Sequence, residues 1–291
     1  MTCWFSASLV LQVCLRDDTV LGTGPPPLWI PQTRRPVAST DRSRIRCQPE
    51  RAWMNTSEKT VERHLSRGLG GNLLTRHGTP VVVVVSCILL LSMVGLLLSV
   101  SPGTVRLTLL SVLAVLWLFM LSFFRNPERT IPTGAGVVSP ADGTVISVTE
   151  VDEDTFVGGP ATRISIFLSI FNVHVNRSPV AGVVEHLHHR RGTFRSATSA
   201  AARETNECQE IGIRMEDGTP VLVRQIAGLI ARRIVCPIKV GDSLDKGFDF
   251  GMIRFGSQTE ITLPKRDGRP FRATVSAGQK LQGGESIVGE W

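Results

Sequence analysis

The sequence predicts a mainly β (α+β) domain that follows a hairpin of two transmembrane helices. Two long apolar runs lie between residues 80 and 124, and each is long enough for a membrane-spanning helix. Beyond residue 125, short stretches alternate apolar and polar residues and are separated by Gly, Pro and Asp, as in antiparallel strands. Amphipathic helix patterns are scarce there, so we expect strands to build the domain.

The composition narrows the compartment and the kinds of partner. The chain has 291 residues and a net charge of +7, which indicates nucleic acid or an anionic membrane surface as a partner. The apolar runs favour the membrane surface, so no nucleic-acid partner is expected. The cysteines form no CxxC pair, which argues against a disulfide framework and a zinc site and is typical of a reducing compartment. They are Cys3, Cys14, Cys47, Cys87, Cys208 and Cys236.

Residues 1–53 differ in character from the rest of the chain. They are rich in Arg, Pro, Ser and Thr and show no sustained apolar periodicity, so we expect a disordered or even untranslated tail. Met54 begins a stretch that looks like a conventional amino terminus, and translation from Met54 is our hypothesis. We interpret residues 54–79 as a basic cytoplasmic segment that leads into the first apolar run.

The membrane hairpin is predicted at residues 80–124. The first span, 80–100, has no charged residue and matches the roughly 20 residues that cross a bilayer as a helix. A short linker joins it to the second span, 107–124, so both flanks lie on one side of the membrane. Basic residues in the two flanks outnumber Arg106 in the linker, and the positive-inside rule therefore places both flanks in the cytoplasm. The alternative is a buried helical hairpin in a soluble core.

Residues 125–291 are expected to form one mainly β domain. "GVVSPADGTVISVTEV" (136–151) has the pattern of strand, turn and strand, and "TRISIFLSIFNVHV" (162–175) that of a buried strand pair. Asp217-Gly218 is a hairpin signal between two further strands.

The Gly256-Ser257 pair interrupts a predicted strand at 251–260, in which Ser257 shares a side with Thr259 and Ile261. Glycine within a strand marks a bulge or a close approach to the backbone. If glycine holds an unusual conformation there, the serine hydroxyl can attack the preceding carbonyl carbon and convert the amide into an ester. Elimination and hydrolysis would then leave a pyruvoyl group at a new amino terminus. An ordinary bulged strand end is the alternative.

Three motifs that occur in order resemble the phosphatidylserine decarboxylases of the short (type A) bacterial and archaeal, pyruvoyl-dependent type. They are "FFRNPERTIPTGAGVVSPADGTV" (123–145), "RISIFLSIFNVHVNRSPVAG" (163–182) and "AGLIARRIVCPIKVGDSLDKGFDFGMIRFGS" (227–257). Together they cover most of the chain beyond residue 123, and three motifs in sequence are far more specific than any one of them.

The resemblance implies a proenzyme that cleaves itself at 256/257 into a β chain that ends at Gly256 and an α chain of residues 257–291. Ser257 becomes the covalent pyruvoyl cofactor, which forms a Schiff base with the substrate amine, and neither a separate cofactor nor a metal is implied. The implied reaction converts phosphatidylserine to phosphatidylethanolamine and CO2 at the cytoplasmic side of the cell membrane. The α and β chains stay associated, and a homo-oligomer is left open.

Two further residues match the acid and base of the family's processing step: Asp142 in "SPADG" and His174 in "FNVHVNRSP". The resemblance implies that His174 accepts the serine proton and that a carboxylate orients its ring. His174 is also the candidate proton donor after CO2 leaves, a role that stays open. The alternatives are a turn carboxylate for Asp142 and a packed strand histidine for His174. Asn206 and Glu207 resemble an Asn-Glu pair of the family, for which we expect a structural role or a place at the edge of the site.

Other functions are weighed against this one. "SPADGTVISV" and "VSAGQKLQGGESIVGEW" resemble halves of lipoyl-like β domains, so a non-enzymatic carrier or adaptor on a membrane anchor is one alternative, although no lysine at an exposed hairpin tip is evident. A decarboxylase of a related serine phospholipid is another. His186, His188 and His189 lack a completing ligand at metal-site spacing, so a solvated strand end is preferred to a metal site.

Overall fold

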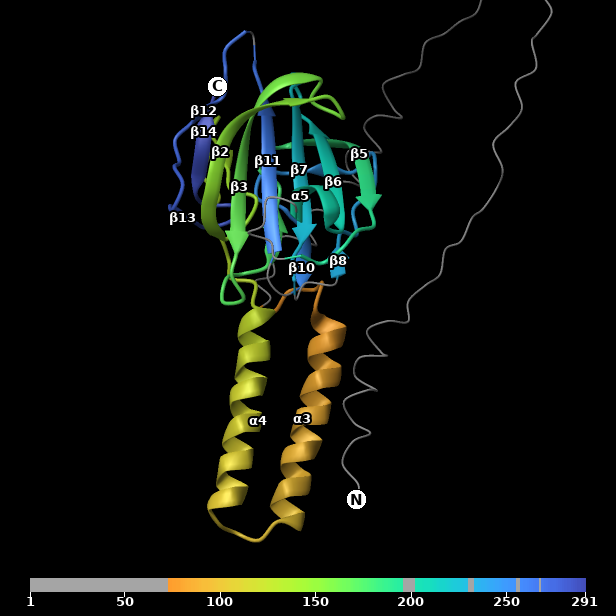
Figure 1. The fold of residues 1–291 in the computed structure, drawn as a ribbon, viewed down its shortest axis with the longest axis vertical. Helices are drawn as coiled ribbons and strands as arrows, with labels where there is room; N and C mark the ends of the chain where they lie inside the picture. The colour runs from red at the N-terminus through yellow and green to blue at the C-terminus, as the bar shows by residue number, and fades with distance from the viewer. Residues whose placement is uncertain (1–72, 196–201, 230–232, 255–256, 267) are drawn as a thin grey trace, which may run out of the picture. The chain divides into compact units, whose positions relative to one another are not determined.

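The computed structural model describes residues 73–195, 202–229, 233–254, 257–266 and 268–291 (Figure 1). The expectations for residues 1–53, for most of 54–79 and for Gly256 itself concern residues outside these ranges.

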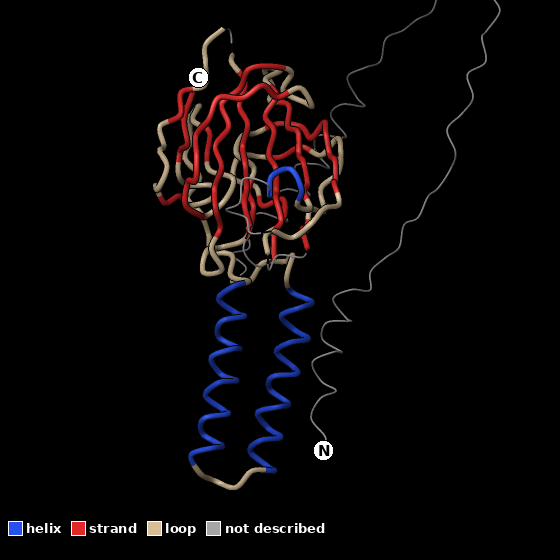
Figure 2. The backbone as a smooth tube through the Cα atoms, in the orientation of Figure 1, coloured by secondary structure: helices blue, strands red, loops and turns tan. Residues whose placement is uncertain are grey.

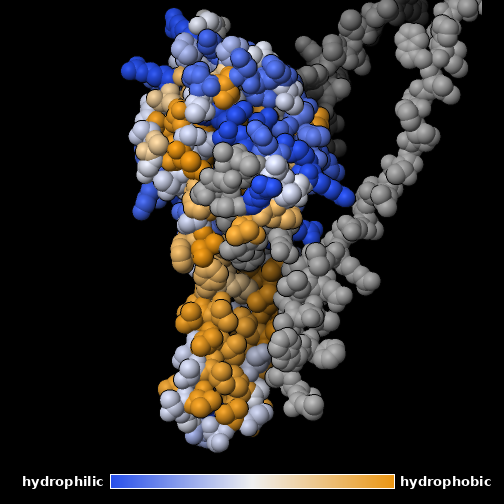
Figure 3. All heavy atoms as spheres, viewed as in Figure 1, coloured by the Kyte–Doolittle hydropathy of each residue, from blue (hydrophilic) through white to orange (hydrophobic). Residues whose placement is uncertain are grey.

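Two apolar helices precede the β domain: α3 (Thr79–Ser99) and α4 (Thr104–Phe123). Both are long and apolar enough to cross a membrane, and they agree closely with the predicted spans. Their apolar side chains remain largely exposed, as the hydrophobic surface in Figure 3 shows, which a buried hairpin of a soluble core would not have. The helices contact each other through the Trp117 indole, whose Nε1 donates to Ser86 Oγ at 3.0 Å.

The remaining chain is mainly β, as predicted, and folds into one large sheet and two small ones (Figure 2). The small sheets have the orders β1-β14-β12 and β4-β10-β8, and α5 (Ala202–Thr205) is a short helix between β5 and β6. The large antiparallel sheet runs, in spatial order, β13 (Lys280–Leu281), β2 (Gly143–Glu153), β3 (Gly159–Leu168), β11 (Ser257–Pro264), β7 (Pro220–Ala227), β6 (Cys208–Arg214), β5 (Gly182–Arg190) and β9 (Ser243–Leu244). The strands of the small sheets are β1 (Val137–Val138), β14 (Ile287–Glu290), β12 (Arg272–Ala273), β4 (Val175–Arg177), β10 (Asp249–Arg254) and β8 (Arg233–Val235).

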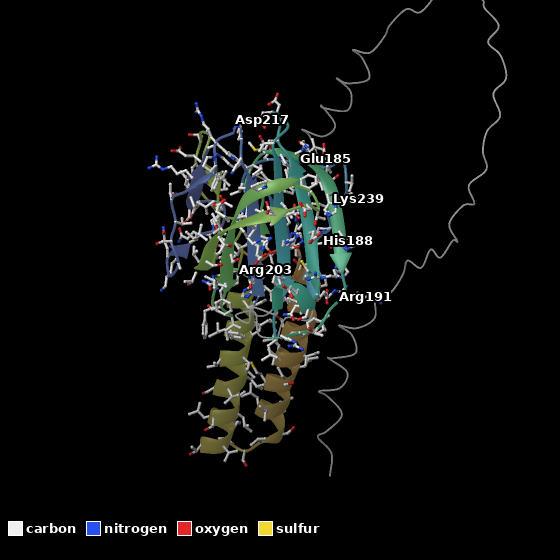
Figure 4. The ribbon with its side chains drawn as sticks, turned by 45° about the horizontal axis from the view of Figure 1, so that its top comes forward. Glu185, His188, Arg191, Arg203, Asp217 and Lys239 are labelled. Carbon is white, nitrogen blue, oxygen red and sulfur yellow. The ribbon has the colours of Figure 1, made fainter. Side chains whose placement is uncertain are left out.

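Strand β11 lies in the middle of the large sheet, and both of its faces are covered. The predicted alternation is confirmed there, because Ile261 and Leu263 point into the main hydrophobic core together with Phe250 of β10. On the opposite face, the fully buried Glu260 accepts hydrogen bonds from Arg203 Nε at 2.6 Å and from Gln258 Nε2 at 2.7 Å. Arg203 comes from α5 (Figure 4). A fully buried strand is therefore satisfied by apolar packing on one side and by charge pairing on the other.

The helical hairpin is joined to β10 by both apolar and polar contacts. Phe124 at the end of α4 packs in one cluster with Met252 of β10. Asp249, the first residue of β10, accepts hydrogen bonds from Arg76 at 2.6 Å and from Asn126 at 3.2 Å, and its Oδ1 lies 3.3 Å from His77 Nε2. Burial alone would raise the pKa of Asp249, but the hydrogen bond with His77 and the charge of Arg76 hold it below its usual value.

Replacing Asp249 with Ala should therefore weaken the junction. The substitution leaves several donors without their acceptor, and we expect a loss of the order of 2 kcal/mol in the free energy of unfolding. Thermal unfolding of the detergent-solubilised protein at neutral pH measures it, and the difference from the wild type should narrow as the pH falls below about 4 toward the lowered pKa of the native carboxylate.

Asp217→Ala is the matched control, because Asp217 pairs with Arg266 at an exposed turn. It should cost less than about 1 kcal/mol. Equal losses in the two variants would contradict a special role for Asp249.

Candidate functional site

The chain passes from one sheet to another immediately before Ser257. Strand β10 ends at Arg254 in the β4-β10-β8 sheet, and β11 begins at Ser257 in the large sheet. The sequence pattern predicted one interrupted strand, whereas the structure has two strands that belong to different sheets. Only residues 255 and 256 separate them, and these lie outside the described ranges. The bond that is predicted to break therefore lies at a sheet-to-sheet crossing.

Ser257 is the first residue of the inner strand β11, and its side chain is enclosed. It is paired on one side with Leu168, the last residue of β3, and on the other with Ala227, the last residue of β7. Its side chain is 0% exposed, and its hydroxyl finds no hydrogen-bond partner in the described part of the chain. A buried polar group without a partner costs free energy, and among the described residues Thr262 Oγ1 on the same strand is another such group. Ser257 is thus both fixed in place and chemically unsatisfied.

His174 lies directly before β4, at the end of that strand nearest to the crossing. Its carbonyl accepts a hydrogen bond from Ile253 N at 3.3 Å, and the next residue, Val175, pairs with Met252. Because Ile253 is only four positions before Ser257, this register brings the His174 end of β4 to the start of β11.

The His174 ring is buried and fixed on two sides. Its centroid lies 4.3 Å from that of Phe123 at the end of α4, and its Nδ1 lies 2.9 Å from the carbonyl oxygen of Asn172. Burial lowers the pKa of His174 to about 4, since the Asn172 carbonyl opposes that shift only in part and the charge of Arg125 adds to it. The imidazole is therefore neutral near pH 7 and able to accept a proton.

A chain of buried side-chain hydrogen bonds links the two sheets beside these residues. Asn176 Nδ2 donates to Thr259 Oγ1 at 3.0 Å, and Asn176 Oδ1 accepts from Gln225 Nε2 at 2.7 Å. Residues two apart on a strand share a face, so Thr259 marks the face of β11 that carries Ser257. Asn176 in the same way follows His174 by two residues. The network thus joins the Asn176 side of β4 to the face of β11 that carries Ser257.

Asp142 lies in a turn next to this network, and its carboxylate is bound by Arg129 and by a backbone N–H group. Its carboxylate accepts two hydrogen bonds from Arg129, at 3.0 and 2.8 Å, and a third from Gly283 N at 2.8 Å. The group at Nδ1 of His174 is therefore the Asn172 carbonyl, not the Asp142 carboxylate. The carbonyl of Pro140, two residues before Asp142, accepts from Arg177 N at 2.9 Å. Asp142 holds the turn that contacts β4.

Sequence reasoning did not identify Asn176, Gln225 and Thr259. In "VHVNR" the alternation places Asn176 opposite Val173 and Val175, on the side that the pattern assigns to solvent, so no local signal marked it as buried. For Asn206 we expected a structural role or a place at the edge of the site, and the structure shows it fully buried, with its Nδ2 donating to the Ala227 carbonyl at 2.8 Å. It thereby fixes the residue that pairs with Ser257.

The predicted solvated histidines lie on β5 and have carboxylate neighbours. His186 Nε2 lies 3.5 Å from Glu210, and His189 Nε2 lies 3.6 Å from Glu207. Burial raises the pKa of Glu207 although His189 and nearby arginines oppose this. Within the described ranges, no group of three or more His, Cys, Asp or Glu side chains is placed to hold a metal ion.

Replacing Asn176 with Leu should destabilise the domain, because Gln225 and Thr259 would lose their partner in a buried place. We expect a loss of about 1–3 kcal/mol for each group left unsatisfied, visible as a lower unfolding midpoint. Asn176→Asp retains the acceptor for Gln225 and should lose less. An unchanged midpoint for Asn176→Leu would show that the network does not hold the sheets together.

Comparison with known proteins points to one family. A family model described as phosphatidylserine decarboxylase matches residues 116–289. The phosphatidylserine decarboxylase proenzyme of Carboxydothermus hydrogenoformans is 51% identical over 176 residues, which are 60% of this chain and 81% of the relative. That of Symbiobacterium thermophilum is 49% identical over 180 residues, 62% of this chain and 82% of the relative. That of Chlorobium phaeobacteroides is 42% identical over 207 residues, 70% of this chain and 92% of the relative.

Proposed function

The chain belongs to the phosphatidylserine decarboxylase family, and we propose that it is a self-processing enzyme that converts phosphatidylserine to phosphatidylethanolamine and CO2. The observation that carries the proposal is the buried, unpartnered hydroxyl of Ser257 at the crossing between two sheets. A lipoyl-like carrier is not favoured, because the curated relatives are decarboxylase proenzymes and a carrier needs an exposed lysine rather than an enclosed serine.

We propose that processing begins when Ser257 Oγ attacks the carbonyl carbon of residue 256 while His174 accepts the hydroxyl proton. The neutral, buried imidazole supports this role. The C–N bond to residue 257 then breaks, and the released nitrogen takes up that proton. The resulting ester then loses its carboxylate by elimination across the Cα–Cβ bond of residue 257. Water converts the remaining dehydroalanine to a pyruvoyl group with release of ammonia. Asp142, bound to Arg129, is proposed to hold the turn beside β4 rather than to bond the imidazole.

The residues around Ser257 fit a group of this kind. A pyruvoyl group at position 257 supplies a keto carbonyl that condenses with the substrate amine and takes up the electrons released with CO2. Leu168 and Ala227 hold residue 257 from both sides, and its side chain is buried. The α chain, from 257, would stay in the sheet because β11 is hydrogen-bonded to β3 and β7, which both belong to the β chain.

The two apolar helices support attachment to a membrane. A phospholipid substrate stays in the bilayer, so an anchored enzyme meets it without extraction. We propose the cell membrane, with the β domain on the cytoplasmic side, because Arg76, Arg125 and Arg129 flank the hairpin and Arg106 lies in its turn. The same basic flanks favour an anionic membrane surface.

Replacing Ser257 with Ala should give a chain that is never cleaved and never decarboxylates. The mass of the purified protein, read together with lipid turnover, measures both properties. Ser243→Ala is the matched control, since Ser243 is exposed in β9, and it should be processed and active like the wild type. A cleaved Ser257→Ala protein would contradict the assigned site.

The pH dependence of processing should report the buried imidazole. Because the folded-state pKa of His174 is about 4, its neutral form persists well below the 6.5 of a free histidine. In cell-free synthesis followed by a pH jump, the cleavage rate should be level near neutrality and should fall about tenfold per unit only below about pH 4.

His174→Ala should slow cleavage by about 100-fold or more. His188→Ala removes an exposed imidazole and serves as the control. A midpoint near 6.5 for the wild type, or normal cleavage and turnover in His174→Ala, would argue against this role.

A further inference from the structure

Three large apolar side chains are exposed on the β domain at the end where the helices join it. Phe171 is 71% exposed, Leu229 is 65% exposed and Leu73 is 87% exposed. Single exposed apolar residues are ordinary on protein surfaces, but a continuous exposed apolar patch marks an interaction site.

Two of these residues follow β3 and β7, at the end of the large sheet where Ser257 begins β11. Phe171 follows Leu168 by three residues, and Leu229 follows Ala227 by two. Leu168 and Ala227 are the two residues that pair with Ser257. The loops therefore flank the strand that starts with the proposed catalytic residue. Figure 1 shows β3 and β7 pointing toward the helices, so the chain leaves both strands on that side.

The exposed loop residues continue the apolar surface of the hairpin. The Phe171 ring lies 6.3 Å from that of Phe119 in α4, edge to face, and the Phe171 carbonyl accepts a hydrogen bond from Arg125 at 2.7 Å. Leu73 is fixed at the same junction, because its carbonyl accepts from Asn126 N at 2.9 Å. Figure 3 shows hydrophobic surface that extends from the helices onto the adjoining part of the domain.

Positive charge accompanies this apolar surface. Arg125 follows the last residue of α4 by two positions, and the exposed Arg191 follows the end of β5 at the same end of the sheet (Figure 4). Apolar side chains next to arginines match the boundary between acyl chains and anionic headgroups, where aromatic rings are enriched.

We propose that the loops of Phe171 and Leu229 enter the membrane interface beside α4 and form a lipid-contact surface that leads phosphatidylserine to Ser257. This inference rests on the proposed function and specifies its partner as the bilayer itself. The hairpin holds the protein at the membrane, while the two loops set the edge of the sheet at the depth of the headgroups. A phosphatidylserine headgroup then reaches the site while its acyl chains stay in the bilayer.

The test compares a bilayer substrate with a dispersed one. The double variant Phe171→Ser/Leu229→Ser is reconstituted in vesicles of phosphatidylcholine and phosphatidylserine and is also assayed with a short-chain, water-soluble phosphatidylserine. We expect normal self-cleavage, a loss of about tenfold or more in kcat/KM on vesicles, and a change within about twofold on the soluble lipid. Equal losses on both substrates, or no loss on vesicles, would overturn the inference.

Val240→Ser is the matched control. Val240 is 60% exposed, and it lies in a turn whose Gly241 N donates to Val184 O near the start of β5, at the opposite end of the sheet. It should behave as the wild type on both substrates.

A second readout does not depend on catalysis. Phe171→Trp should gain fluorescence that brominated acyl chains quench, whereas Val240→Trp should not. Quenching no greater than in Val240→Trp would mean that the surface meets something else, such as a second copy of the chain, and would overturn the inference. A wild type that remains uncleaved and inactive would instead refute the proposed function, and the quenching would still decide whether the loops meet lipid.

Discussion

The structure depends on one constraint: the chain must leave the sheet that contains β10 and enter the large sheet as its central strand β11 within two residues. Neighbours hold both ends of this crossing. Met252 and Ile253 are fixed by β4 and β8, and Ser257 is fixed between β3 and β7. Neighbouring strands therefore hold the chain on both sides of this short connection. Positioning of this kind is the cheapest way to favour an intramolecular attack.

The burial of β11 explains why the crossing is stable despite an unsatisfied hydroxyl. Core packing of Ile261 and Leu263 on one face and the Arg203–Glu260 pair on the other stabilise the strand as a whole. An unpaired hydroxyl costs about 1–3 kcal/mol, and within the described residues β11 has two of them, at Ser257 and Thr262, which such a strand can offset. The surrounding strands thus sustain a local defect at the residue that we propose to be reactive.

Part of this arrangement could be predicted from the sequence. The rest depends on contacts between distant residues, which local patterns do not report. The two apolar helices and the alternation within 257–263 depend on local patterns, whereas the roles of Ser257 and His174 rest on the resemblance and stay predictions. The partners Asn176, Gln225 and Thr259 are tens of residues apart in sequence, so no local period relates them. The division of 251–260 between two sheets was missed for the same reason, because strand patterns report which side is buried and not which sheet a strand joins. Asp142 was found through its motif, but its pairing with Arg129 depends on where the chain that follows α4 runs.

Strand β10 contacts both the helical hairpin and the residues near Ser257. Asp249 at its start is bound by Arg76 and Asn126 from the two ends of the hairpin, and Ile253 near its end contacts His174, whose ring rests on Phe123 of α4. Under the proposed reaction, scission cuts the chain after β10 and before β11. The hairpin, β10 and the histidine then belong to one chain and the pyruvoyl residue to the other. The pairing of β11 with β3 and β7 must therefore keep the two chains together, and it also keeps the reactive end beside the membrane anchor.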